Sequence, residues 1–128
     1  MIYIIYIFIS FLSGEVSPGY TLFSPLPFQG ASNYYTYLMN NDGDYINTWI
    51  HDCKPVTLAY LLPDSSIVIP CSQNEVDGLG NPNQITGGRI LKIAWDGEIL
   101  WDDVFVDTSF EPHHDIEPLP NGNILFVA

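Results

Sequence analysis

An internal repeat is the feature that most constrains the fold. Residues 42–46 (Asp-Gly-Asp-Tyr-Ile), soon followed by Trp49, are matched later in the chain by 96–101 (Asp-Gly-Glu-Ile-Leu-Trp). Residues 62–69 (Leu-Pro-Asp-Ser-Ser-Ile-Val-Ile) are matched at a similar offset by 119–126 (Leu-Pro-Asn-Gly-Asn-Ile-Leu-Phe). Repeats of roughly 40 to 50 residues built only from strand signals are typical of propeller blades, and this period is slightly longer. The repeat therefore predicts an all-β chain made of consecutive units.

Four hairpins are expected in series, each with two short strands around a turn. They comprise residues 36–40 with 44–50, 56–62 with 66–71, 89–95 with 98–105, and 115–119 with 123–127. The Asp-Gly and Asn-Gly turns favour type I′ geometry, which needs positive φ at both central residues. The second and third hairpins together would form one complete β-propeller blade, with a half-blade on each side. Residues 72–88, rich in Asn and Gly, are expected to form a long exposed loop.

The N-terminus has the pattern of a targeting segment. Residues 1–12 are apolar apart from Ser10, and the run is too short for a membrane-spanning helix of about 20 residues. We expect a signal peptide over 1–14 and export to the periplasm or the outside. Because no Lys or Arg precedes the apolar run, an uncleaved anchor and a buried first strand remain alternatives. Residues 15–35 would then be a lead-in segment, and 36–128 a partial propeller.

The charge balance limits the class of partner. Fifteen acidic residues against three basic ones give a net charge of −12. An electrostatic grip on nucleic acid or on an anionic membrane needs clustered Lys and Arg, so both are excluded as partners. We expect a small-molecule partner, and contact with a membrane only through an uncleaved N-terminal segment.

Cysteines, tryptophans and one oxygen-rich segment have simple interpretations. Cys53 and Cys71 fit either a disulfide in an oxidising compartment or two small buried hydrophobes. The three tryptophans lie at repeat positions and are expected to fill the core. Residues 40–44 alternate oxygen ligands but lack the glycine and glutamate positions of a calcium loop, so a hairpin turn explains them. No metal or cofactor is expected.

The candidate site is His113-His114-Asp115. Segments 62–69 and 119–126 match, and the same offset makes residues 56–58, Val-Thr-Leu, the equivalents of 113–115. The fold therefore does not need polar side chains at these positions. Alternation along a strand would put His113 and Asp115 on one face and His114 on the other, unless a bulge re-aims them. This end of a hairpin, where an inner strand enters the sheet, surrounds the central channel of a propeller. Histidine there offers a nucleophile, a general acid or base, or a metal ligand, and Asp115 could fix its tautomer.

These elements together resemble the bacterial-type arylsulfotransferases. The resemblance covers about residues 19–128 and rests on the segments 19–25, 37–43, 87–97, 113–115 and 119–123. Asp-Gly and Pro-Asn-Gly elements occur in many propellers, whereas their order and spacing here are more specific. The resemblance implies an exported six-bladed propeller that moves a sulfuryl group from a phenolic sulfate ester to a phenol. In that family a histidine carries the group transiently, which implies ping-pong kinetics.

The residue roles that the resemblance implies are restricted to matching positions. His114 and His113, with Asp115, would line the channel, while Arg89 is expected to be structural. Later blades that would carry further histidines and an arginine have no match in residues 1–128, so this part alone is expected to be inactive. A non-catalytic binding or scaffold propeller is the alternative, because fold does not dictate chemistry. A quinoprotein-like or hydrolytic propeller, with histidine on a cofactor or metal, is a third.

Overall fold

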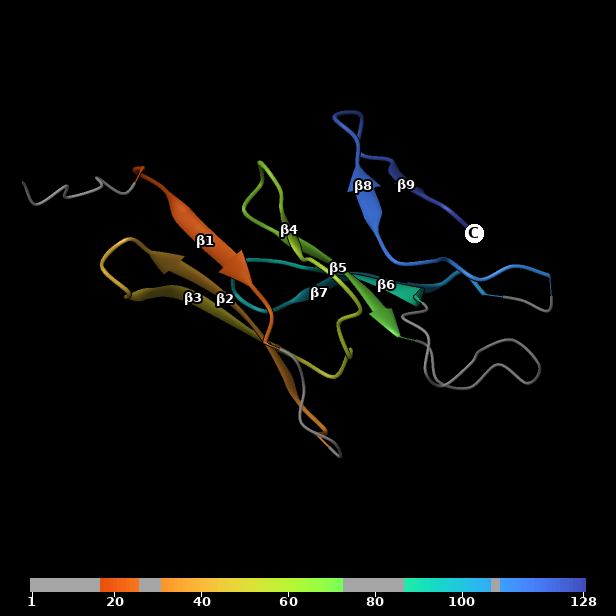
Figure 1. Cartoon of the computed structure of the whole chain (residues 1–128), viewed down its shortest axis with the longest axis horizontal. Coiled ribbons are helices and arrows are strands. Elements are labelled where there is room, and N and C mark those ends of the chain that lie inside the picture. The colour runs from red at the N-terminus through yellow and green to blue at the C-terminus, as the bar shows by residue number, and fades with distance from the viewer. Residues whose placement is uncertain (1–16, 26–30, 73–86, 107–108) are drawn as a thin grey trace, which may run out of the picture.

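The chain folds into strands and turns (Figure 1). The computed structural model describes residues 17–25, 31–72, 87–106 and 109–128. Within these ranges every regular element is a β-strand, which confirms the all-β class, and no helix there could cross a membrane. The expected signal peptide and most of the expected loop at 72–88 lie outside the described residues.

Three antiparallel sheets follow one another along the chain. The first contains β1 (Tyr20–Phe23), β2 (Tyr34–Asn40) and β3 (Tyr45–His51), in that order. The second contains β4 (Tyr60–Leu61), β5 (Ile67–Ser72), β6 (Gly88–Ile93) and β7 (Ile99–Val104). The third is the pair β8 (Ile116–Pro118) and β9 (Ile124–Phe126). In Figure 1 the first sheet lies on the left, the second in the middle and the third at the upper right.

All four expected hairpins are present, and the second and third share one four-stranded sheet, as predicted. Two strands differ from expectation. β1 lies in the lead-in segment, where no strand was predicted; it pairs with β2 over four residues, too few to show an alternation. The predicted strand at 56–62 is reduced to β4, because the chain bends at residues 56–57, where Thr57 Oγ1 donates to the carbonyl of His114 (3.0 Å).

The hydrogen bonds of the first and third hairpins reproduce the repeat seen in the sequence. Gly43 N donates to Asn40 O at 3.2 Å, and Gly97 N donates to Ala94 O at 3.1 Å. Both hairpins also contain a register shift at the same place, between Leu38 and Met39 in one and between Lys92 and Ile93 in the other. The first and third hairpins therefore share a backbone geometry as well as a sequence pattern.

The second and fourth hairpins repeat one another in the same way. Leu62 N donates to Ser66 O, and Leu119 N donates to Asn123 O, both at 2.8 Å. Ser65, with φ of 63°, takes the place that Gly122, with φ of 86°, has in the later turn. The matching segments of the sequence thus form matching turns.

The type I′ expectation is wrong for these turns. Within each of these four turn loops, only the last residue has positive φ: Gly43, Ser65, Gly97 and Gly122. Each loop thus ends in a single left-handed residue, as in the other common hairpin connection, in which a type I turn is followed by a left-handed position.

β5 is the centre of the fold, and it is buried from Ile67 to Cys71. One side of its sheet, including Ile67 and Ile69, packs on Leu38 and Trp49 of the first sheet. The other side packs through Val68 and Ile90 on Ile116 of β8. The neighbouring sheets therefore cover both faces of the middle sheet at β5 and β6, while β7 is mostly exposed.

The tryptophans do not share one role. Trp49 is 1% exposed and donates Nε1–H to Ala94 O at 2.8 Å, which confirms it as a core residue joining the first two sheets. Trp95 is 43% exposed, so the core expectation is wrong there; it lies at a turn and meets Trp49 edge-on. Trp101 is half-buried and packs on Phe105.

Candidate functional site

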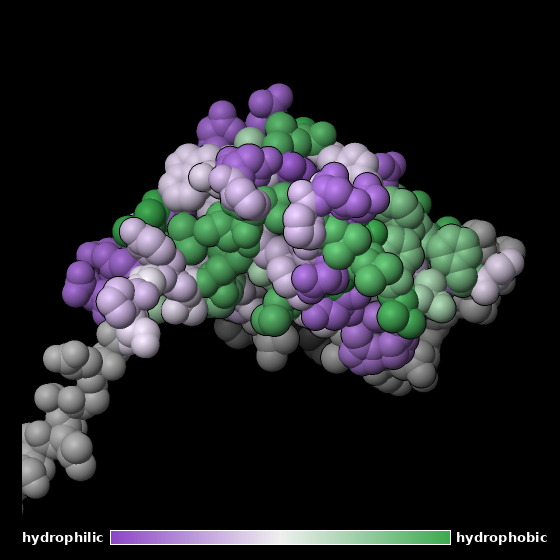
Figure 2. All heavy atoms as spheres, turned by 90° about the horizontal axis from the view of Figure 1, so that it is seen from above, coloured by the Kyte–Doolittle hydropathy of each residue, from purple (hydrophilic) through white to green (hydrophobic). Residues whose placement is uncertain are grey.

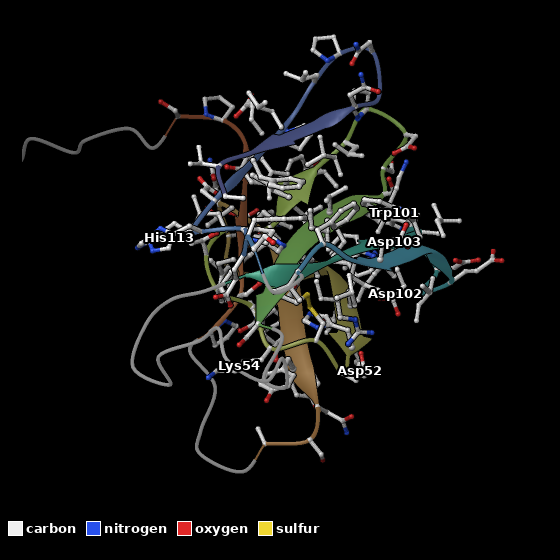
Figure 3. The ribbon with its side chains drawn as sticks, turned by 90° about the vertical axis from the view of Figure 1, so that its right-hand side faces the viewer. Asp52, Lys54, Trp101, Asp102, Asp103 and His113 are labelled. Carbon is white, nitrogen blue, oxygen red and sulfur yellow. A yellow bond between two sulfur atoms is a disulfide. The ribbon has the colours of Figure 1, made fainter. Side chains whose placement is uncertain are left out.

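The histidine pair lies where the fourth hairpin begins. His113, His114 and Asp115 are exposed between two buried neighbours, Pro112 and Ile116. His113 N donates to Val127 O at 2.8 Å and starts the pairing of the two strands, at the end away from their turn. Figure 3 shows the side chain of His113 projecting from the edge of the molecule, on the opposite side of this view from Trp101.

The correspondence between residues 113–115 and 56–58 holds in the structure. Val56 N donates to Pro70 O at 3.1 Å, and His113 N makes the same bond to Val127 O. The two donors are separated by the same offset as the two acceptors, as the sequence predicted. Equivalent three-residue segments of the backbone therefore have the sequence Val-Thr-Leu in the second hairpin and His-His-Asp in the fourth.

The backbone at His114 is strained. Its φ is 65°, and Asp115 N donates to His113 O at 3.0 Å, which closes a γ-turn around it. The form of this turn with positive φ is rare and strained. Simple strand alternation is therefore wrong here: the turn re-aims His114, and the two imidazole rings lie together with centroids 3.8 Å apart.

The two rings meet through their Nδ1 atoms. A hydrogen bond between two imidazole nitrogens requires one to carry the hydrogen and the other to accept it. The ring whose Nδ1 donates then has a lone pair on Nε2, and the other neutral ring carries Nε2–H. The contact thus leaves one exposed histidine with a nucleophilic or hydrogen-bond-accepting Nε2 and the other with a hydrogen-bond-donating Nε2–H.

Asp115 is held by the preceding unit. Its carboxylate accepts from Tyr60 Oη at 2.9 Å and from Thr57 Oγ1 at 3.1 Å, and also from Ile116 N at 2.9 Å. Among the described residues its hydrogen bonds go to these groups and none goes to an imidazole. It therefore anchors the backbone next to the histidines, instead of fixing a tautomer directly.

Tyr60 remains protonated in this arrangement. Burial, its hydrogen bond to Asp115 and the negative charges of Asp115 and Glu117 together raise its pKa to about 12. It consequently acts as a hydrogen-bond donor at neutral pH. The sequence offered no signal for Tyr60 or Thr57, because their partners lie far along the chain.

Arg89 has the structural role that was expected. Its guanidinium binds Asp102 in a bidentate pair, at 2.7 and 2.8 Å, and reaches Asp52 at 3.1 Å. These contacts raise the pKa of Arg89 and lower that of Asp102. The ion pairs join β6 to β7 and to the segment after β3.

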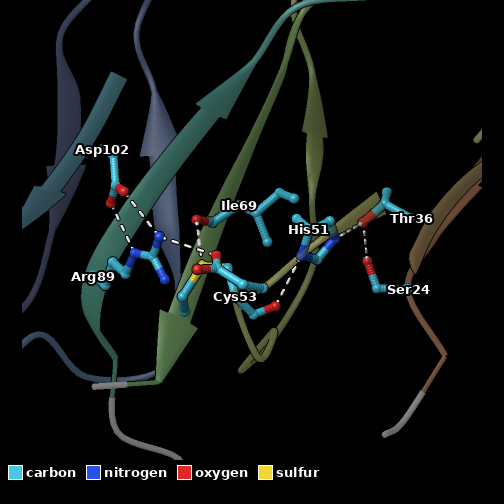
Figure 4. The surroundings of a disulfide bond; sticks show 9 residues. Ser24, Thr36, His51, Cys53, Ile69, Arg89 and Asp102 are labelled. Carbon is cyan, nitrogen blue, oxygen red and sulfur yellow. Dashed lines mark hydrogen bonds and ion pairs between the residues drawn. A yellow bond between two sulfur atoms is a disulfide. The ribbon is translucent and has the colours of Figure 1, made fainter. Parts of the chain in front are cut away.

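The third histidine, His51, is buried, and the sequence did not indicate it as a site residue. His51 Nδ1 meets the carbonyl of Cys53 at 2.9 Å, and Nε2 meets Thr36 Oγ1 at 3.0 Å, which in turn contacts Ser24 Oγ at 2.8 Å (Figure 4). Since a carbonyl only accepts, Nδ1 carries the hydrogen and Nε2 accepts from Thr36. Burial lowers the pKa of His51, aided weakly by Arg89 and opposed by the Cys53 carbonyl and Asp52. The signal in the sequence that could have indicated a buried histidine is the place of His51 on the inward-facing side of β3, at the end of the strand.

The two cysteines form a disulfide, Cys53–Cys71, which resolves the alternatives left by the sequence. Both cysteines are buried beside the hydrogen-bonded residues Ser24, Thr36 and His51 (Figure 4). The bond ties the segment after β3 to the end of β5, at the start of the second hairpin. This pairing is consistent with an oxidising compartment.

An apolar groove of about 760 Å³ lies between the middle sheet and the β8–β9 hairpin. Trp101, Phe105 and Phe126 line it, and the ion pair between Lys92 and Asp64 (3.0 Å) borders it. Seen from above, the molecule exposes apolar side chains between polar ones on this side (Figure 2). Residues of the turns at 62–66 and 119–123 also line the groove. It therefore lies at the turn end of the two hairpins, and the histidines lie at the other end.

Comparisons with known proteins identify no relative: no family model, curated protein or solved structure matches the chain. In the described ranges, no group of three or more His, Cys, Asp or Glu side chains converges in a way that would hold a metal ion. The function must therefore be argued from the geometry of the site.

Proposed function

We propose that the chain is part of an exported β-propeller of the arylsulfotransferase type. Three features support the fold: units that repeat in sequence and in hydrogen bonding, a four-stranded sheet made of two successive hairpins, and neighbouring units packed on both of its faces. In this arrangement β4–β7 is one complete blade, and β1–β3 and β8–β9 are parts of the blades beside it. The disulfide supports export.

The histidine pair carries the proposed activity. One imidazole, with its lone pair on Nε2, would attack the sulfur of a phenolic sulfate ester. The N–S bond forms as the S–O bond to the phenol breaks, and the phenolate leaves with that electron pair. The neighbouring Nε2–H would donate a hydrogen bond to a sulfuryl oxygen as charge develops there.

The second half of the reaction reverses the first. The hydroxyl oxygen of an acceptor phenol attacks the same sulfur and passes its proton to solvent water, while the N–S bond breaks and its electron pair returns to Nε2 of the imidazole. A phenolic sulfate donor and a phenol acceptor would thus use one site in turn, without a cofactor. The single observation behind this scheme is the contact between the Nδ1 atoms of two exposed histidines.

The test is transfer of the sulfuryl group from p-nitrophenyl sulfate to phenol by the native protein that contains this chain. His113→Gln and His114→Gln should each lower the rate, the nucleophile variant by more, within about 10²–10⁴-fold. Without acceptor, a brief incubation should leave one sulfuryl group on a peptide containing residues 113–114, detectable by mass spectrometry. His51→Gln is the control, because that histidine is buried and hydrogen-bonded elsewhere.

A non-catalytic binding module is the alternative, and the apolar groove favours it. Pockets of this size and apolar character are typical of small-molecule sites. If both histidine variants keep the rate and melting temperature of the native protein, and no sulfuryl peptide forms, the binding module becomes the better proposal.

A further inference from the structure

The backbone at His114 requires an external support. A γ-turn with positive φ is strained and persists only where surrounding contacts determine it. Hydrogen bonds fix this turn on both sides. On the N-terminal side, His113 N is bonded to Val127 O. The support on the C-terminal side comes from the preceding unit.

Thr57 reaches the central residue and the last residue of the turn. Its hydroxyl lies 3.0 Å from the carbonyl oxygen of His114 and 3.1 Å from Oδ1 of Asp115, so its one hydrogen is shared between them. Tyr60 donates to the other carboxylate oxygen of Asp115 at 2.9 Å. Asp115 uses Oδ1 to accept from Ile116 N as well, which fixes the first residue of β8.

We propose that Thr57 and Tyr60 are positioning residues for the histidine pair. Through the carbonyl of His114 and the carboxylate of Asp115, they hold the γ-turn that places the two imidazoles together on one side of the strand. Among the described residues, the hydrogen bonds of the two hydroxyls go to the His114 carbonyl and the Asp115 carboxylate, so their effect on the imidazoles passes through these groups. The inference relies on the proposed function for its catalytic meaning, whereas the geometry can be tested without activity.

The experiment compares Thr57→Val and Tyr60→Phe, singly and together, in the native protein. Each change removes one hydroxyl and keeps most of the side-chain volume. Imidazole nitrogen NMR reports the pairing directly, because one donor and one acceptor Nδ1 give separate signals. In the double variant we expect these two signals to merge toward an average. We also expect kcat for sulfuryl transfer to fall by up to about 10²-fold with little change in KM, as for a misplaced reacting group.

Matched controls come from exposed positions in β3. Thr48→Val and Tyr45→Phe remove the same hydroxyls from exposed side chains and should leave the imidazole signals unchanged. Thr57→Ser keeps the hydroxyl and should restore the wild-type spectrum, which loss of packing alone does not predict. Circular dichroism and unfolding curves would confirm that each variant is folded.

The outcomes separate the two proposals. Unchanged imidazole signals in the folded double variant would overturn the positioning role, whatever the activity. Merged signals in a protein whose wild type transfers no sulfuryl group would support the positioning role and refute the proposed function. Failure of Thr57→Ser to restore the signals would also overturn the assignment to the hydroxyl.

Discussion

The earlier unit, residues 53–71, and the later unit, residues 110–128, are two versions of one hairpin. Their turns and first hydrogen bonds agree at one constant offset along the chain. The earlier unit has the Cys53–Cys71 disulfide, and the equivalent positions of the later unit are Phe110 and Ala128. The later unit instead has the strained turn and the histidines. One copy of the scaffold is reinforced, while the other bears strain beside exposed polar groups, as functional sites often do.

The first way to sharpen this comparison is to damage the core that the earlier unit shares with the first sheet. Trp49→Ala removes a side chain that is 1% exposed and joins the first two sheets. We expect the free energy of unfolding to fall by about 3–5 kcal/mol, from lost burial and the cavity left behind. Denaturant unfolding measures it. Trp95→Ala, at a 43% exposed residue, is the control and should cost much less.

The second test removes the feature found only in the earlier unit. Replacing Cys53 and Cys71 together by Ala should lower the free energy of unfolding by about 3 kcal/mol, since the bond closes a loop with a sequence separation of 18. Reduction of the native protein should cause a similar loss. A double variant as stable as the native protein would show that the earlier unit is not reinforced by this bond.

The third test concerns the strain found only in the later unit. Glycine adopts positive φ readily, whereas alanine does not, so His114→Gly should be more stable than His114→Ala by about 1 kcal/mol. Both lack the imidazole, so the difference isolates the backbone. The same pair of substitutions at Thr57 gives the control. Equal stability of Gly and Ala at position 114 would mean that the turn is not strained.

The fourth test uses pH to separate the buried histidine from the exposed pair. Because burial lowers the pKa of His51 below its ordinary value of 6.5, the unfolded chain binds its proton more readily. The stability that depends on neutral His51 is therefore complete above pH 6.5 and declines as pH falls toward the folded pKa. His51→Gln should flatten unfolding free energy against pH in that window. An unchanged slope would contradict a buried neutral His51.

The smallest effect concerns the turns. Ser65, with φ of 63°, occupies the position of Gly122, so Ser65→Gly should stabilise the earlier unit by about 0.5 kcal/mol. The gain is small because glycine also adds freedom to the unfolded chain. Gly122→Ser should lower stability by a similar amount, and thermal unfolding of both variants measures the pair. A loss of stability on Ser65→Gly would show that the two turns are not equivalent.

The sequence predicted what depends on local pattern. Asp-Gly and Asn-Gly marked the turns, and the two offsets identified equivalent positions such as Val56 and His113. It misplaced Trp95, because a repeat position does not reveal that a turn exposes the side chain. Strand alternation failed at His114 because contacts from Thr57, in the preceding unit, hold its backbone out of the strand. The series of hydrogen bonds from Ser24 through Thr36 to His51 likewise depends on the pairing of β1 with β2, which no local signal indicates.

The contact between Thr57 and His114 has a consequence for how this chain can vary. The two residues hold the same place in successive units, so each touches its own counterpart. Equivalent residues of two successive units thus share a hydrogen bond. Because the threonine hydroxyl donates to a main-chain carbonyl, it constrains the shape at position 114 but not the side chain there. Among relatives we therefore expect a hydroxyl residue at position 57 to be kept while position 114 diversifies, so that one copy preserves the geometry in which the other can acquire new chemistry.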